Sequence, residues 1–326
     1  MIISRTPFRI SFFGGGTDYP EWYMENGGSV LSTTINKYCY VSCRHLPPFF
    51  KHRFRIVYSN VENCNTVSEI RHPAVKASLE YLKMNHGLEI HHDGDLPACT
   101  GLGSSSAFTV ALLNALHALR QKMPTKKQLS LEAIEIERKI LKESGGVQDQ
   151  IAVAYGGLNR ITFNGEFAVQ PVILNKYRLK EFKSHMMLYF TGLSRLSGEI
   201  SKKQAANIPN KKNELSRMSA MVNESLKILT GGDIELFGKL LDETWQIKRT
   251  LSDSITNQRI DDIYKASLEA GALGGKLLGA GGGGFILLFA RPSDQPRIRE
   301  KLKDLLLVPF EFDNLGAQII FYDREA

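Results

Sequence analysis

The segment 96–107, Leu-Pro-Ala-Cys-Thr-Gly-Leu-Gly-Ser-Ser-Ser-Ala, has the composition of an anion-binding turn. Gly101 and Gly103 let the backbone approach a ligand closely, because neither residue carries a Cβ atom. Three serines, 104–106, then begin a predicted helix whose first amide groups have no partner within the helix. These N–H groups, the hydroxyls and the positive end of the helix dipole favour a phosphate. A serine-capped helix without a ligand is the structural alternative.

Two further glycine-rich loops lie at 14–18 and 279–284. The first, Gly-Gly-Gly-Thr-Asp, follows a strand pattern and carries one carboxylate, Asp18. The second, Gly-Ala-Gly-Gly-Gly-Gly, satisfies the dinucleotide pattern G-x-G-x-x-G, but a strand pattern follows it where that fold requires a helix. The P-loop pattern is absent, since a leucine follows Gly275-Lys276. The signatures of protein kinases are missing as well.

Hydrophobic periodicity places these loops on a mixed framework of helices and strands. Strand patterns occupy 2–13, 28–35, 37–43, 53–58, 88–92, 158–163, 167–173, 185–190, 276–278, 285–290 and 317–322, with 28–43 forming one long strand or two. Helix patterns occupy 75–84, 104–119, 128–141, 211–229, 234–251, 259–270 and 296–306, and a short helix is expected around Asp149. Asn164-Gly165 predicts a hairpin with a type I′ turn.

In their order and context, the three loops resemble the motifs of the GHMP small-molecule kinases. Pro7-Phe-Arg-Ile followed by 14–19 is similar to the first motif, 96–107 to the second, which wraps the ATP phosphates, and 276–284 to the third, which closes over the active site. The resemblance covers nearly the whole chain. It implies an α+β fold of two domains with the active site in the cleft between them. The N-terminal domain, 1–175, would be ribosomal-protein-S5-like, and the C-terminal domain, 176–326, would be an α/β sandwich.

The resemblance also implies catalytic roles. Gly-Val-Gln-Asp-Gln at 146–150 is similar to the galactokinase segment that holds the catalytic aspartate, so Asp149 is expected to accept the proton of a substrate hydroxyl. Arg9 matches the cation beside that aspartate and is expected to stabilise the transferring phosphoryl charge. Glu137 and Ser105 match the family's Mg²⁺ ligands, and a carboxylate with a hydroxyl suits that ion. A helix cap at Asp149, a surface ion pair at Arg9 and a solvated helix face at Glu137 are the structural alternatives.

The implied cofactors are ATP and Mg²⁺. Binding of the ATP phosphates is assigned to Pro97, Gly101, Leu102, Gly103, Ser104, Ser105 and Ser106. Binding of the acceptor is assigned to Gly15, Gly16, Thr17, Asp18, Gly281 and Gly282.

The first motif narrows the acceptor. Asp18 matches the aspartate that binds sugar hydroxyls in galactokinases, whereas Gly15 and Gly16 stand where galactokinases and mevalonate kinases carry a Glu-His pair. Residues 6–18 are most similar to the motif of the bacterial D-glycero-D-manno-heptose 7-phosphate kinases, which phosphorylate the anomeric hydroxyl on the route to nucleotide-activated heptose and surface glycans. L-Fucokinases share much of this motif. A sugar phosphate acceptor would need cationic partners, for which the candidates are Lys37, Arg44, Arg160 and Arg195.

Composition limits the class of protein. The 326 residues exceed one typical core, and a net charge of +7 suits an enzyme with phosphorylated substrates. The basic residues are scattered, so no nucleic-acid partner is expected. No apolar run reaches the roughly 18 residues of a membrane span, and no signal peptide or zinc spacing is evident, which predicts a cytoplasmic protein with reduced thiols. The assembly is left open between a monomer and a homodimer, and a non-catalytic sensor of sugar and nucleotide is the alternative of another class.

Overall fold

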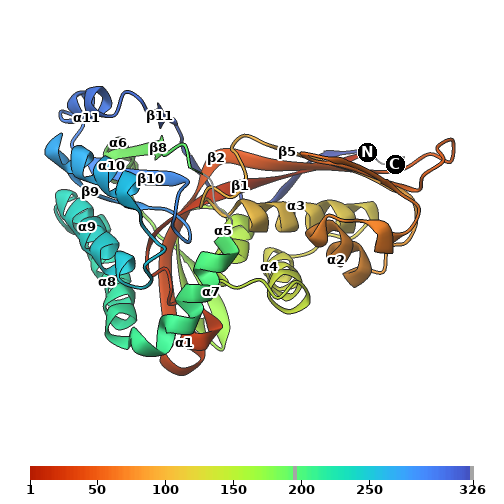
Figure 1. The fold of residues 1–326 in the computed structure, drawn as a ribbon, viewed down its shortest axis with the longest axis horizontal. Coiled ribbons are helices and arrows are strands. Elements are labelled where there is room, and N and C mark those ends of the chain that lie inside the picture. Colours follow the sequence, from red (N-terminus) through yellow and green to blue (C-terminus); the bar gives the residue numbers. More distant parts are fainter. Residues whose placement is uncertain (194–196, 324–326) are drawn as a thin grey trace.

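The computed structural model describes residues 1–193 and 197–323. Its elements form two sheets that are joined by helices (Figure 1). The strands are β1 (Ile2–Phe13), β2 (Gly28–His45), β3 (Phe54–Val57), β4 (Val61–Cys64), β5 (Leu88–Gly94), β6 (Asn159–Asn164), β7 (Glu166–Pro171), β8 (Met186–Phe190), β9 (Ala272–Leu277), β10 (Phe285–Ala290), β11 (Leu306–Leu307), β12 (Phe312–Asp313) and β13 (Gln318–Tyr322). The helices are α1 (Pro20–Asn26), α2 (Pro73–Tyr81), α3 (Ser104–Leu119), α4 (Lys126–Ile134), α5 (Gln148–Tyr155), α6 (Lys176–Ser184), α7 (Ser197–Asn207), α8 (Lys212–Gly231), α9 (Glu235–Arg249), α10 (Gln258–Glu269) and α11 (Gln295–Lys301).

The first sheet has nine strands. Six of them follow the order β13-β1-β2-β5-β3-β4, and β12, β6 and β7 lie off this path. β2 is one continuous strand of 18 residues, and it pairs with β1, β5, β6 and β12 along its length. Helix α3 packs against β1 and β2, and 13 of its 16 residues are buried, which explains why its sequence is apolar on nearly every side. The start of this helix is thereby held at a fixed place beside the sheet.

The second sheet is antiparallel and has the order β11-β8-β10-β9. All six residues of its central strand β10 are buried, and helices α9 and α10 pack against its strands. The structure therefore has the expected two-domain α+β organisation. The last strands of the chain, β12 and β13, return to pair with β2 and β1 in the first sheet, while the division between residues 175 and 176 stays a prediction.

A cluster of phenylalanines joins the two sheets. Phe12 and Phe13, at the end of β1, contact Phe237 of α9 with ring centroids 5.6 and 5.0 Å apart. Phe237 in turn contacts Phe182 of α6 and Phe289 of β10 at 4.7 and 5.3 Å. These contacts have the edge and tilted geometries that aromatic pairs prefer. Because they are buried in one continuous core, the two halves hold a fixed relation around the cleft.

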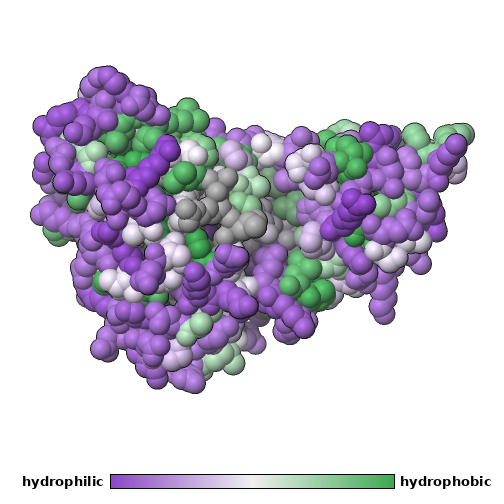
Figure 2. Space-filling model, viewed as in Figure 1, coloured by the Kyte–Doolittle hydropathy of each residue, from purple (hydrophilic) through white to green (hydrophobic). Residues whose placement is uncertain are grey.

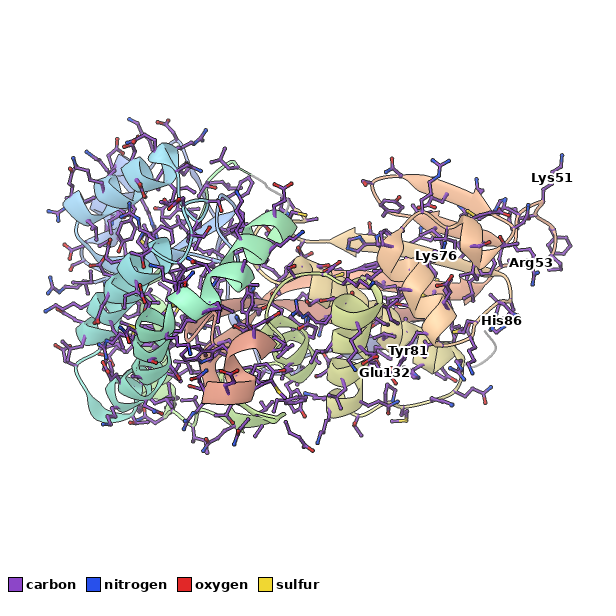
Figure 3. All side chains as sticks on the ribbon, turned by 60° about the horizontal axis from the view of Figure 1, so that its bottom comes forward. Lys51, Arg53, Lys76, Tyr81, His86 and Glu132 are labelled. Carbon is purple, nitrogen blue, oxygen red and sulfur yellow. The ribbon has the colours of Figure 1, made fainter. Side chains whose placement is uncertain are left out.

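The visible surface of the described residues carries no large apolar region (Figure 2). The face in Figure 2 is mainly hydrophilic, and its apolar residues form small separate patches. Lys51, Arg53, Lys76 and His86 lie at the end of the first half that is far from the second sheet (Figure 3). No helix in residues 1–193 and 197–323 has the length and apolar character needed to cross a bilayer.

Candidate active site

A cavity lies where β1, α3 and α5 meet α7, α9 and β9. Segments from both halves of the chain line it, which agrees with the predicted cleft. The predicted site residues that line it are Arg9, Gly15, Gly16, Asp18, Gly101, Gly103, Ser104, Ser105, Ser106, Glu137 and Asp149. The structure therefore brings most of the predicted residues into one space, and the role of each stays a prediction.

Three predicted residues contact other parts of the protein instead of the cavity. The Thr17 hydroxyl is buried and donates hydrogen bonds to the carbonyls of Gly14 and Ser29. The Leu102 side chain is buried and its carbonyl accepts from the amide of Arg9, at 2.9 Å. The Pro97 carbonyl accepts from the Thr100 hydroxyl at 2.8 Å. These hydrogen bonds shape the loops, and the three side chains do not line the cavity.

Gly281 and Gly282 also lie outside the lining, which at this loop consists of Gly279 and Ala280. A Cβ atom at Gly281 would stand 2.7 Å from backbone atoms of Ile255, and the amide of Gly282 donates to the Ile255 carbonyl. These glycines serve close packing against a neighbouring loop. Of the cations considered for an acceptor phosphate, Lys37, Arg44 and Arg160 do not line the cavity, and Arg195 lies outside the described residues.

Arg9 and Asp149 form a bidentate ion pair in the lining of the cavity. Arg9 Nε donates to Asp149 Oδ1 and Arg9 Nη2 to Oδ2, each at 2.7 Å, while Nη1 donates to the Gly101 carbonyl at 2.6 Å. The Arg9 side chain is 4% exposed and that of Asp149 is 26% exposed. Arginine thus fixes the plane of a carboxylate that keeps access to the cavity. The surface-pair alternative for Arg9 is wrong, because the guanidinium is buried.

The beginning of α3 lies directly beside this pair. Gly103, at φ +74°, ends the turn that precedes the helix, and a Cβ atom there would stand 3.1 Å from Arg9 Cγ and 3.5 Å from Asp149 Oδ2. Ser104, Ser105 and Ser106 follow in the first helical turn and line the cavity. A phosphate bound by these amides would therefore lie next to the Asp149 carboxylate.

Glu137 is a buried carboxylate in a π-helical segment, Glu135–Ile140, that continues α4. Its Oε2 accepts hydrogen bonds from the Ser106 hydroxyl, at 2.9 Å, and from the Gln150 amide. Its Oε1 is buried and has no hydrogen-bond partner within the described residues. Burial raises the pKa of Glu137 to about 7. The surface-helix alternative for this residue is wrong, because its side chain faces the interior.

An Mg²⁺ ion fits this donor set. Glu137 and the exposed Ser105 line the same cavity, and Glu137 Oε1 has no hydrogen-bond partner within the described residues. Mg²⁺ combines one or two carboxylate or hydroxyl oxygens with phosphates and water. Ser106, which the sequence did not single out as a metal ligand, is the serine that bonds Glu137 directly.

Asp18 is the second carboxylate near Asp149. Its Oδ1 accepts from the amide of Gly16 at 2.9 Å, and its Oδ2 accepts from the amide of Gln148 at 3.3 Å. Burial raises the pKa of Asp18, and the nearby charge of Asp149 raises it further. Gly146 is required for this approach, because a Cβ atom there would stand 1.7 Å from Asp18 Oδ2.

The second and third glycine loops are pressed together across the cleft. A Cβ atom at Gly101 would stand 2.4 Å from the Leu278 carbonyl oxygen, and one at Gly279 would stand 2.3 Å from Gly101 Cα. The amide of Phe285 donates to the Thr100 carbonyl at 3.1 Å. This backbone contact couples the glycine loop at 100–103 to the loop that precedes β10.

Sequence reasoning missed several polar residues of the cavity. Lys276 belongs to the third motif but was given no role, and Lys248 lies in an ordinary amphipathic helix, α9, whose pattern gives no signal for a site. Two more, Ser201 and Gln204, come from α7, a helix that the periodicity did not predict. Tyr19, Gln148 and Gln150 adjoin predicted residues and could have been found from those neighbours.

Two family models match the chain: "GHMP kinases N terminal domain" over residues 65–157 and "GHMP kinases C terminal" over residues 221–306. Together they account for more than half of the sequence. They fall on the first and second halves respectively, and the first includes the loop at 96–107, Glu137 and Asp149.

Several curated proteins and solved structures that are similar to this chain are sugar kinases, and mevalonate kinases are similar to it as well. The D-glycero-alpha-D-manno-heptose 7-phosphate kinase of Campylobacter jejuni is 26% identical over 93% of each chain. The L-fucokinase/L-fucose-1-P guanylyltransferase of Bacteroides fragilis is 26% identical over 93% of this chain and 36% of its own. The crystal structure of a D-glycero-D-manno-heptose 1-phosphate kinase from Bacteroides thetaiotaomicron superposes with a TM-score of 0.82, at 25% identity, over 99% of this chain and all of that one.

Proposed function

Since this chain belongs to the GHMP kinases, a family of ATP-dependent phosphotransferases, we propose that it transfers the γ-phosphoryl group of Mg·ATP to the anomeric hydroxyl of D-glycero-D-manno-heptose 7-phosphate, giving the 1,7-bisphosphate. The observation that carries the proposal is the Arg9–Asp149 pair at the beginning of α3. A carboxylate next to a phosphate site is placed to receive a hydroxyl proton while the phosphoryl group arrives. The proposed setting is the cytoplasm, where ATP is supplied.

The residues divide the work of the transfer. The amides and hydroxyls of 103–106 bind the ATP phosphates, and Asp149 orients the acceptor hydroxyl and takes its proton on a carboxylate oxygen. Arg9 fixes that carboxylate and balances negative charge beside it. Glu137 Oε1 and the Ser105 hydroxyl would hold Mg²⁺, which neutralises phosphate charge when bound.

The acceptor assignment rests on the first glycine loop and on the relatives. Around Gly15 there is room: a Cβ atom would meet nothing closer than Gln148 Nε2 at 3.8 Å. Asp18 beside this space would bind sugar hydroxyls, with no side chain at 15 or 16 to limit the size of the sugar. The names of the heptose kinases differ in whether the phosphate already on the sugar is at carbon 7 or carbon 1. L-Fucose is the second candidate, from the similarity to the Bacteroides fragilis enzyme.

An acceptor screen tests the proposal. ADP release from Mg·ATP is measured with D-glycero-D-manno-heptose 7-phosphate, the 1-phosphate, unphosphorylated heptose, L-fucose, galactose and mevalonate. We expect turnover to be fastest with the 7-phosphate. Faster turnover with the 1-phosphate or L-fucose would reject the acceptor while keeping the kinase. Nucleotide binding without turnover on any acceptor would instead favour the non-catalytic sensor.

A further inference from the structure

The wall of the cavity that comes from the second half carries two buried lysines. Lys248, on α9, is 6% exposed, and Lys276, on β9, is 2% exposed. Lys248 Nζ donates to the carbonyls of Leu277, at 3.0 Å, and Gly279. Lys276 Nζ donates to the Phe12 carbonyl at 2.8 Å. Both side chains line the same cavity as Arg9 and Asp149, and neither is used by the mechanism above.

Their hydrogen bonds leave donors and charge without a partner. An ammonium group has three N–H donors. Within residues 1–193 and 197–323, carbonyl oxygens take two donors of Lys248 and one of Lys276, and neither lysine forms an ion pair. A buried ammonium is costly unless an anion compensates it. The fold therefore buries two lysines at a place where the described residues supply them only with neutral acceptors.

Two carboxylates of the cavity, Asp149 and Asp18, are bonded to groups other than the lysines. Both oxygens of Asp149 are bonded to Arg9, and the two oxygens of Asp18 accept from the amides of Gly16 and Gln148. Burial lowers the pKa of Lys248 to about 7 and that of Lys276 well below its usual value, and the charge of Arg9 lowers both further, while Asp18 raises them. A bound anion would raise both pKa values and favour the ammonium form of each lysine. Four cations, Arg9, Arg138, Lys248 and Lys276, and four carboxylates, Asp18, Glu137, Glu143 and Asp149, line this space. Within the described residues none of these carboxylates forms an ion pair with either lysine, so an incoming phosphate would supply the charged partner that the protein does not.

We propose that Lys248 and Lys276 form a phosphate-binding subsite on this wall, which rests on the phosphoryl transfer proposed above and extends it. Its chemistry is that of a phosphate group with two or more anionic oxygens, bound by two ammonium groups. Two phosphates of the reaction have this chemistry: the γ-phosphoryl group of the nucleotide and the phosphate already on the acceptor.

The alternative is a purely structural role, in which the lysines only bond the carbonyls of Phe12, Leu277 and Gly279. Substitution by glutamine separates the two roles, because glutamine can still donate to a carbonyl but carries no charge. The variants are Lys248→Gln and Lys276→Gln. Lys239→Gln is the matched control, since Lys239 is an exposed lysine on the same helix α9.

Two ratios of affinity are measured by isothermal titration calorimetry. The first ratio is the affinity for Mg·AMP-PNP divided by the affinity for Mg·ADP, and it reports binding of the γ-phosphate. The second ratio is the affinity for heptose 7-phosphate divided by the affinity for unphosphorylated heptose, and it reports binding of the acceptor phosphate. Both sugars are titrated in the presence of Mg·ADP, so that no turnover occurs. We expect one of these ratios to fall at least tenfold in both lysine variants and to stay unchanged in Lys239→Gln.

Each outcome has a separate meaning. A fall in the first ratio assigns the subsite to the nucleotide, and a fall in the second assigns it to the acceptor. Both ratios unchanged in folded variants would overturn the subsite, even if the enzyme phosphorylates heptose 7-phosphate. A fall in the first ratio together with no turnover on any heptose would keep the subsite and reject the acceptor. Thermal unfolding checks the fold, and Lys248→Met and Lys276→Met, which replace a buried charge with an apolar chain of similar length, form the second series for the same two ratios.

Discussion

The two walls of the cavity hold their charges in different ways. On the wall from the first half, Arg9 is paired with Asp149, and Glu137 accepts from Ser106 and Gln150. On the wall from the second half, Lys248 and Lys276 are bonded to carbonyl oxygens and have no carboxylate partner among the described residues. Paired groups hold a reactive geometry before any ligand arrives, whereas unpaired cations gain their partner from the ligand. In the reaction proposed above, proton transfer therefore belongs to the first wall and anion binding to both.

The first prediction removes the charge that orders the first wall. Arg9→Met should lower kcat by roughly 10²- to 10³-fold, because it frees the Asp149 carboxylate and removes a cation beside the transferring group. Initial rates of ADP release measure this. The control is Arg44→Met, since Arg44 is also paired with a carboxylate, Glu89, but lies outside the cavity. A variant at Arg9 with the turnover of the Arg44 control would show that the ion pair is structural only.

The second prediction disturbs the contact that joins the two walls. Gly101→Ala places a Cβ atom 2.4 Å from the Leu278 carbonyl oxygen at a residue with φ +83°. We expect a loss of about 2 kcal/mol or more in the free energy of unfolding, measured with urea, and weaker binding of Mg·AMP-PNP. Gly231→Ala is the control, because a Cβ atom at Gly231, the last residue of α8, meets nothing within 4 Å. Equal stability of the two variants would argue against close packing of the loops.

The third prediction concerns the pH dependence of the first wall. Burial raises the pKa of Glu137 from an ordinary 4.5 to about 7, so the folded state holds a proton that the unfolded state has lost in this range. The contribution of Glu137 to the free energy of unfolding is fully present below pH 4.5 and is lost as the pH rises to about 7, at about 1.4 kcal/mol per pH unit. Urea unfolding of the nucleotide-free protein should show this slope, and Glu137→Gln should lack it.

Ligand binding gives the opposite slope at the same residue. Because Mg²⁺ needs an ionised carboxylate, the affinity for Mg·AMP-PNP should increase as the pH rises through about 7 and then level off. Glu137→Gln should bind weakly at every pH. An identical pH profile in the variant would remove Glu137 from the metal site.

The smallest expected effect is at Gly15. A Cβ atom there meets only ordinary contacts, at 3.8 Å from Gln148 Nε2 and 3.9 Å from Ser11 Oγ, so Gly15→Ala should fold with normal stability. If the acceptor occupies this space, the KM of Gly15→Ala for the acceptor should increase a few-fold, while its KM for ATP stays unchanged. A change in the ATP KM alone would place the nucleotide, and not the sugar, at the first loop.

The sequence predicted the elements with strong periodicity and missed those whose pattern is weak. β1, β2, α3, α8, α9 and α10 lie close to their predicted ranges because their apolar faces follow a regular period. Helices α6 and α7 are polar, and nothing in their period marked them. Helix α11 ends at Lys301, and residues near its predicted end form β11.

The hairpin at Asn164-Gly165 was predicted correctly in position but not in turn type. Asn164 pairs with Glu166, so Gly165 alone joins the two strands, and within 163–167 it alone has a positive φ, of +76°. A type I′ turn has two central residues with positive φ. The strand pairing therefore continues through Asn164 and leaves no room for the expected turn, which dipeptide composition cannot reveal.

The site followed the same division. Motifs that lie on short contiguous segments identified Arg9, Asp149, Glu137 and the serines of α3, because glycines and charged residues there stand out against the apolar framework. At least 98 residues of sequence separate Lys248 from the residues of the first wall. It belongs to an amphipathic helix, and the helical period alone accounts for a lysine at this position. Only tertiary packing brings such a residue to the site.

The most direct test of the account is turnover by Asp149→Asn with heptose 7-phosphate and Mg·ATP, compared with its affinity for Mg·AMP-PNP. Asparagine keeps the shape of the side chain but cannot take the hydroxyl proton. The account predicts that kcat falls by roughly 10²- to 10⁴-fold while the nucleotide affinity stays within about threefold of the wild type. Turnover near the wild-type rate, with nucleotide bound normally, would contradict the assignment of Asp149 as the base.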